Sequence, residues 1–196
     1  TREVISRFLF KAYRRPPNPD EIQRSIALVD NAINKGEKWE SAMQFAMQAA
    51  LCSPKFLFKL EMDGKPNNAE VRKLDDFQLA SRLSYFIWSS MPDQILFDLA
   101  SKKQLGPNLD KEVLRMLQDS KSSALVQNFA LQWLQIKRLD LVSPDIKLFP
   151  SFDLKLRSAM RTETELFFSS IIKEDRSILD LIDSDYTFLN ETLAKH

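Results

Sequence analysis

The chain has 196 residues, of which 44% are apolar and 28% charged, and its formal net charge at pH 7 is +1. This composition predicts a globular protein with a substantial core, and it argues against a concentrated basic face for nucleic acid. Three glycines and one cysteine, Cys52, argue against a glycine-rich phosphate loop and exclude an internal disulfide, a Cys-based zinc cluster and a c-type haem attachment site.

The first sixty residues contain three amphipathic periodicities, which predict a three-helix unit. The first helix is expected over Val4–Tyr13. The run Asn18-Pro19-Asp20-Glu21 offers a cap, a proline in the first turn and two acids, so a second helix should begin there and end at Gly36. A third helix is expected from Lys38 to Leu51.

Residues 62–73 are polar and contain several turn-forming residues. They therefore predict a linker between an N-terminal domain, residues 1–61, and a C-terminal helical bundle, residues 74–196.

A central helix is predicted to begin at Asp75, because Gln78 three residues later completes a capping-box pattern. It should end at Ser89-Ser90, since Pro92 cannot continue a helix. Pro92-Asp93 then suits the first turn of the next helix.

Two longer helices are expected over Lys121–Ile136 and Asp153–Glu174, with a last one near Glu191. The irregular stretch between the longer helices, residues 137–150, contains many apolar residues and is expected to be packed. Four aromatic residues are expected to lie in the core: Trp88, Trp133, Phe167 and Phe168. The predicted fold is all-α, a multi-helix bundle of about eight to ten helices with an N-terminal three-helix unit and a larger C-terminal helical bundle.

Glu163 is the most informative single position, because it falls inside the apolar arc of the predicted 153–174 helix. A carboxylate there is expected to be buried, either in an ion pair with Arg82, Arg14 or Arg15, or as a general acid, base or ligand. Candidate substrate-binding residues around it are Arg82, Tyr85 and Asp185.

The residue inventory predicts no metal site. A ferritin-like site needs two Glu-x-x-His pairs, whereas the chain has one histidine, His196. The acids and hydroxyls of residues 183–190 lack the spacing and glycine of a calcium loop, so Asn190 or Thr187 is expected to cap the last helix.

No apolar run is long enough to span a membrane, and the N-terminal residues Thr1-Arg2-Glu3 form neither a signal peptide nor a natural start. The chain is therefore expected to be an excised piece of a longer protein.

Several motifs resemble a known family. The most specific is Ser-Arg-Leu-Ser-Tyr-Phe-Ile-Trp-Ser-Ser-Met-Pro-Asp at residues 81–93. Five further stretches carry the likeness: Phe8–Pro16, Ser53–Glu61, Asn128–Leu134, Glu163–Phe168 and Asp185–Glu191. They are similar to the adjacent helical domains of unknown function found in large proteins of planctomycetes and related bacteria. The resemblance implies an exported, periplasmic protein that often carries a c-type haem domain N-terminal to this region, and it implies no catalytic residues.

The leading functional prediction is a scaffolding or domain-docking part of such an exported, cytochrome-linked protein, with neighbouring domains of the same polypeptide as its partners. It predicts no cofactor within this chain, a c-type haem only elsewhere in the parent protein, no nucleic-acid partner and no membrane span. The alternative is a substrate-binding part of a haem-linked oxidoreductase with Glu163 in its pocket, which leaves open whether the protein is an enzyme. Glycan binding through surface aromatics is a third hypothesis without a motif.

Overall fold

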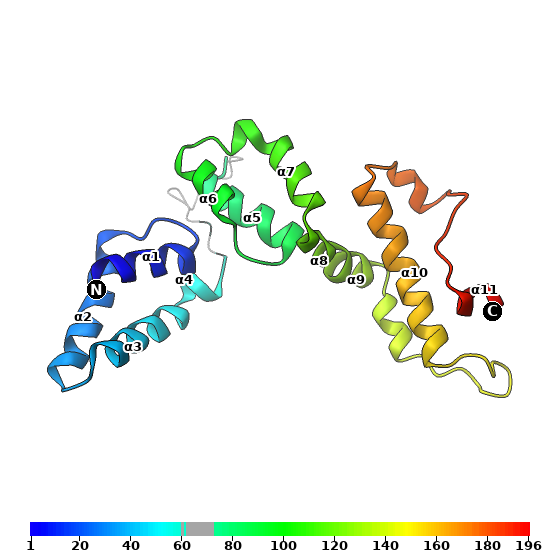
Figure 1. Ribbon diagram of the computed structural model, residues 1–196, viewed down its shortest axis with the longest axis horizontal. Helices are drawn as coiled ribbons and strands as arrows, with labels where there is room; N and C mark the ends of the chain where they lie inside the picture. The colour runs from blue at the N-terminus through cyan, green and yellow to red at the C-terminus, as the bar shows by residue number, and fades with distance from the viewer. Residues whose placement is uncertain (60, 62–72) are drawn as a thin grey trace, which may run out of the picture. The chain divides into compact units, whose positions relative to one another are not determined.

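The computed structural model describes residues 1–59, 61 and 73–196, and these residues form helices and turns without any strand (Figure 1). The prediction of an all-α fold is confirmed. The chain divides into two compact units, Thr1–Ser84 with Met91–Asn108, and Tyr85–Ser90 with Leu109–His196. The predicted linker lies, apart from residue 73, outside the described residues.

The first unit contains the N-terminal helices and most of the central one. Its elements are α1 (Arg2–Tyr13), α2 (Pro19–Asn34), α3 (Trp39–Leu51), α4 (Pro54–Leu57), α5 (Asp76–Trp88), α6 (Gln94–Ser101) and the 3-10 turn η1 (Gly106–Asn108). The last residues of α5 belong to the second unit. The predicted stop after α2 is confirmed, because Gly36 has a φ of +90°.

The predicted cap of α2 and the predicted capping box of α5 are confirmed, and the cap of α2 is a capping box as well. At α2 the Asn18 side chain accepts from the Glu21 N–H, and the Glu21 carboxylate accepts from the Asn18 N–H, each at 2.8 Å. At α5 the Asp75 carboxylate accepts from the Gln78 N–H at 2.8 Å, and the Gln78 side chain accepts in return at 3.3 Å. These four residues therefore fix where two helices begin.

Apolar side chains of α1, α2 and α3 form the core of the first unit. Its fully buried members include Leu9, Val29 and Met43. The ring of Phe10 on α1 lies 6.0 Å from that of Phe77 on α5 and 4.9 Å from that of Phe97 on α6. Aromatic contacts at these separations are favourable, so they join α5 and α6 to the N-terminal helices.

A buried arginine connects α1 to α4. Arg14 adopts the left-handed conformation directly after α1, with a φ of 56°. Its guanidinium is buried and donates to the carbonyls of Lys55, Phe56 and Phe58 at 3.0–3.2 Å. These bonds satisfy carbonyls around α4 that have no helical partner, so Arg14 holds the short helix in place.

The Glu21 carboxylate is buried between two cations. Arg15 donates two hydrogen bonds to it, at 2.8 and 3.0 Å, and Lys55 forms a salt bridge to the same group. The Arg15 hydrogen bonds, more than any other contact, lower the pKa of Glu21 from 4.5 to about 2. The carboxylate therefore stays charged despite its burial.

The second unit is built around one long helix, α10 (Leu154–Lys173). The elements before it are α7 (Leu109–Gln118), η2 (Ser120–Ser122), α8 (Ser123–Leu125), η3 (Val126–Ala130), α9 (Leu131–Trp133) and η4 (Ile136–Asp140), and those after it are η5 (Ile178–Leu181) and α11 (Glu191–Lys195).

The predicted regular helix over Lys121–Ile136 is instead interrupted by a π turn, η3. There the Leu131 N–H donates to the Val126 carbonyl, five residues back. Val126 and Ala130 of this turn pack against Phe168 of α10, with Leu181 partly buried beside them. The π turn therefore lies in the core of the second unit.

Trp88, the last residue of α5, is buried in the second unit as predicted. Its indole N–H donates to the Met116 carbonyl at 2.9 Å. The cations of Lys121 and Arg115 lie 4.6 and 5.5 Å from its ring centroid, within the range of cation–π attraction. No helix in the described ranges has the length and apolar character needed to cross a membrane.

We expect Glu21→Gln to reduce the free energy of unfolding of the first unit by about 3 kcal/mol at pH 7, which corresponds to a carboxylate pKa depressed from 4.5 to about 2. The pKa of Glu21 is lower in the folded state than in the unfolded state, so its contribution to stability is fully present above pH 4.5. This contribution is lost as the pH falls to about 2. Urea unfolding of both proteins should therefore give curves that converge across this pH window.

Glu3→Gln is the matched control, because Glu3 forms an exposed salt bridge with Arg7. It should change stability little at any pH. If the difference in unfolding free energy between Glu21→Gln and the unchanged protein stayed constant from pH 7 to pH 2, the lowered pKa assigned to Glu21 would be contradicted.

Candidate functional site

Residues 141–149, here called the apolar loop, present large apolar side chains to solvent. Leu141, Ile146 and Leu148 are exposed by 82%, 76% and 73%, and Phe149 is exposed as well. The prediction that this stretch is packed is therefore wrong. Apolar composition shows that burial is favourable, whereas it does not show whether a covering surface exists within the second unit.

Two arginines of α10 hold the beginning of the apolar loop. Arg157 donates to the carbonyls of Asp140 and Val142 at 2.8 and 2.7 Å. Arg161 donates to the carboxylate of Asp140 at 2.7 Å. Further along, the Asp145 side chain accepts from the Lys147 N–H at 2.8 Å in an Asx turn. The loop backbone is therefore fixed although its side chains are exposed.

Glu163 is half-buried, so the prediction of a buried carboxylate is wrong. It accepts a hydrogen bond of 2.5 Å from the Thr187 hydroxyl, and it forms no salt bridge within the described ranges. The predicted arginine partner is also wrong. Glu163 lies within the apolar arc of α10, and the segment before α11 reaches it and supplies a neutral donor.

The three arginines considered as partners of Glu163 have other contacts. Arg14 and Arg15 bind within the first unit as described above. Arg82 also belongs to that unit; it is exposed and donates to the Glu61 carboxylate at 2.8 Å. This hydrogen bond lowers the pKa of Glu61 and raises that of Arg82.

The remaining predicted site residues, Tyr85 and Asp185, belong to the second unit together with Glu163. Tyr85 is half-buried on the last turn of α5. Asp185 is exposed, two residues before Thr187, and forms no ion pair in the part of the chain that the structure describes. Their role in substrate binding stays a prediction.

Tyr186 holds the segment before α11 against α10. Its ring lies 5.3 Å from Phe167 and 6.0 Å from Phe188, and its hydroxyl is 3.4 Å from that of Ser170. The Arg176 guanidinium lies over the same ring, 4.5 Å from its centroid. The next residue, Thr187, also binds α10 through its hydrogen bond to Glu163.

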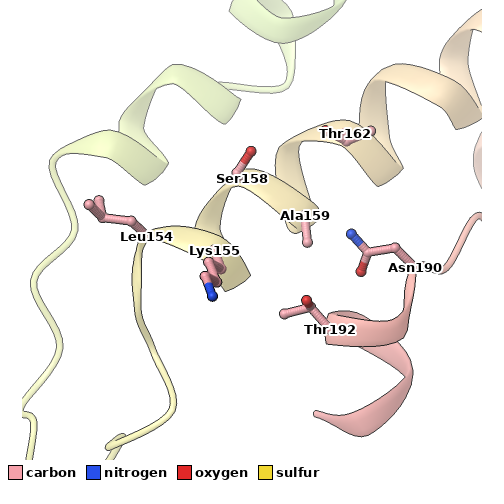
Figure 2. A pocket seen from close by; sticks show the side chains of 7 residues that line it. All are labelled: Leu154, Lys155, Ser158, Ala159, Thr162, Asn190 and Thr192. Carbon is pink, nitrogen blue, oxygen red and sulfur yellow. The ribbon is translucent and has the colours of Figure 1, made fainter.

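A shallow open pocket of about 390 Å³ lies between α10 and α11 (Figure 2). It is lined by Leu154, Lys155, Ser158, Ala159, Thr162, Asn190 and Thr192. In Figure 2 the Asn190 side chain is directed toward Ala159. Asn190 also caps α11 by accepting from the Leu193 N–H at 3.0 Å, which confirms one of the two predicted caps.

The lining offers hydroxyls, an amide and one cation, and these groups can hydrogen-bond a polar ligand. Glu163 is not among the lining residues. Sequence reasoning missed this polar row, although Lys155, Ser158 and Thr162 are spaced by three and four residues and so share one face of α10. In the described ranges, no group of three His, Cys, Asp or Glu side chains could hold a metal ion.

Trp133 was expected in the core and is exposed instead, so that prediction is wrong, whereas Phe168 is buried as expected. The Trp133 ring stacks on Phe129 with centroids 5.8 Å apart and an interplanar angle of 18°. The Phe168 ring meets both rings in T-shaped geometry, with centroids 6.4 Å from Phe129 and 6.5 Å from Trp133. Phe168 thus connects the pair to the core, while Phe129 and Trp133 themselves are exposed.

We expect Thr187→Val to raise the rate of amide hydrogen exchange over residues 186–190 while the melting temperature changes by about 2 °C or less, because a solvent-exposed hydrogen bond contributes about 1 kcal/mol at most. Hydrogen-exchange mass spectrometry measures the first quantity and calorimetry the second. Thr192→Val is the control, since no hydrogen bond of its hydroxyl is formed in the described ranges. Unchanged exchange in Thr187→Val would contradict the attachment.

Comparison with known proteins leads to one assignment. No curated protein and no solved structure matches the chain. Residues 1–61 match the family described as PSD5, protein of unknown function (DUF1595). Residues 74–196 match the family described as PSD4, protein of unknown function (DUF1592), and these residues make up more than half of the chain. The chain therefore belongs to the DUF1592 family and carries a DUF1595 domain directly before it.

Proposed function

We propose that the chain is a scaffolding or domain-docking part of a larger protein, and that the apolar loop is a surface on which a neighbouring domain of the same polypeptide packs. The observation that carries this proposal is the combination of exposed side chains and a fixed backbone in residues 141–149. Exposed apolar patches on a structured surface mark interaction sites.

The energetics favour docking at this loop. Complete burial of an apolar side chain such as Leu141, Ile146 or Leu148 contributes about 1.5–3 kcal/mol. Arg157 and the Asx turn at Asp145 already hold the loop backbone. Binding of a partner therefore costs little free energy for ordering the loop. The apolar surface can therefore contribute most of its burial energy to binding.

The wider context is part of the same proposal. The resemblance of residues 81–93 to the planctomycete helical domains supports an exported, periplasmic parent protein. A c-type haem domain in that parent would lie outside this chain, whose one cysteine cannot form the attachment site that such a haem requires.

The alternative, a substrate-binding part of a haem-linked oxidoreductase, requires Glu163 in a ligand pocket. The structure pairs Glu163 with Thr187, and the pocket beside α11 is lined by other residues. Docking is therefore the function that the geometry supports best.

The test is chemical labelling of a cysteine placed in the loop. Ile146→Cys is made in a Cys52→Ser background, in the chain of residues 1–196 and in the parent protein. We expect a maleimide to label position 146 at least tenfold more slowly in the parent protein than in the chain of residues 1–196, because a docked domain covers the apolar loop in the parent protein.

Lys111→Cys in the same background is the control, since Lys111 is exposed and lies on α7 of the same unit. Its labelling rate should be the same in both proteins. Equal rates at position 146 in the two proteins would show that no domain covers the loop, and the proposal would be wrong.

A further inference from the structure

A second exposed apolar surface lies at the other end of α10. Ile178, Leu179 and Ile182 in and directly after η5 are exposed by 76%, 66% and 88%. Leu181 between them packs instead toward the core formed by Val126, Ala130 and Phe168. The turn is thus anchored by one side chain, and it presents the other three outward. These three residues are here called the η5 surface.

Acidic residues surround the η5 surface in the sequence. Residues 174–191 contain one cation, Arg176, and six acids: Glu174, Asp175, Asp180, Asp183, Asp185 and Glu191. Arg176 is already engaged, because it pairs with Glu174 at 2.7 Å and lies over the Tyr186 ring. Asp175, Asp183 and Asp185 are exposed and form no ion pair within the described ranges.

The backbone of η5 offers no edge for a partner strand. The N–H groups of Asp180 and Ile182 donate to the carbonyls of Ser177 and Leu179, and the Ser177 hydroxyl accepts from the Leu179 N–H at 3.2 Å. A partner must therefore bind through side chains, as an amphipathic helix does when its apolar face packs on an apolar patch.

We infer that the η5 surface docks a basic amphipathic helix of a neighbouring domain. Apolar side chains on one face of that helix would cover Ile178 and Ile182, while its flanking Lys or Arg residues would meet Asp183 and Asp185. The exposed acids that flank the η5 surface in the sequence disfavour nucleic acid and anionic membranes as partners. This inference rests on the proposed docking function and adds a second surface and the chemistry of its partner.

The test uses two synthetic helical peptides with the same leucine face, one flanked by lysines and the other by glutamates. Each is labelled with a fluorophore and titrated with the chain of residues 1–196, and binding is followed by fluorescence anisotropy. We expect the lysine peptide to bind at least tenfold more tightly, and its affinity to fall as salt rises from 50 to 300 mM, because exposed charges are then screened.

Two double variants locate the site. Ile178→Ser/Ile182→Ser and Asp183→Asn/Asp185→Asn should each weaken binding of the lysine peptide about tenfold, and the second should also reduce its salt dependence. Leu114→Ser/Asp110→Asn on α7 makes the same kinds of change at exposed positions and should leave binding unchanged. Circular dichroism checks that each variant is folded.

Equal affinity for both peptides, or equal weakening by the α7 variant, would overturn the inference. Maleimide labelling of Ile182→Cys in the parent protein, again with Cys52→Ser, distinguishes a failure of the η5 inference from a failure of the proposed docking function. Protection at 146 without protection at 182 would leave the proposed function standing and reject the η5 surface. Protection at 182 alone would support the η5 surface and reject the apolar loop as a docking surface.

Discussion

The second unit depends on the packing of Phe168 against the π turn at Val126 and Ala130. This contact fixes α10, and α10 in turn positions the segments on either side of it. Arg157 near its beginning binds the start of the apolar loop, and Leu181 after its end joins the same core. Both surfaces that we propose for docking are therefore presented by segments that one buried aromatic residue holds in place.

Local signals in the sequence were sufficient to predict where helices begin and end. Asp75/Gln78 was recognised as a capping box and Asn18 as part of a cap, because the hydrogen bonds involved join residues only three apart. Gly36 ended α2 for an equally local reason, namely a positive φ. Such features need no knowledge of the tertiary structure, and so the all-α fold could be predicted from the sequence.

Predictions that depended on a covering surface were less successful. Glu163 lay within the apolar arc, yet only the fold shows that Thr187 reaches it and that no arginine does. Trp133 and the apolar loop were assigned to the core because of their hydrophobicity, which measures the tendency to be buried and not the presence of a neighbour. The pocket residues came from two separate segments, α10 and the start of α11, and no sequence pattern links those segments.

The length of α10 has a consequence for anything that binds at its ends. The helix has 20 residues, and at a rise of 1.5 Å per residue it is about 30 Å long. The apolar loop precedes its first turn, and η5 follows its last. Electrostatic interactions in physiological salt decay over about 8 Å, so two bound neighbours would be electrostatically independent of each other. The helix would then act as a rigid spacer, setting the distance between two partners while keeping their charges from influencing one another.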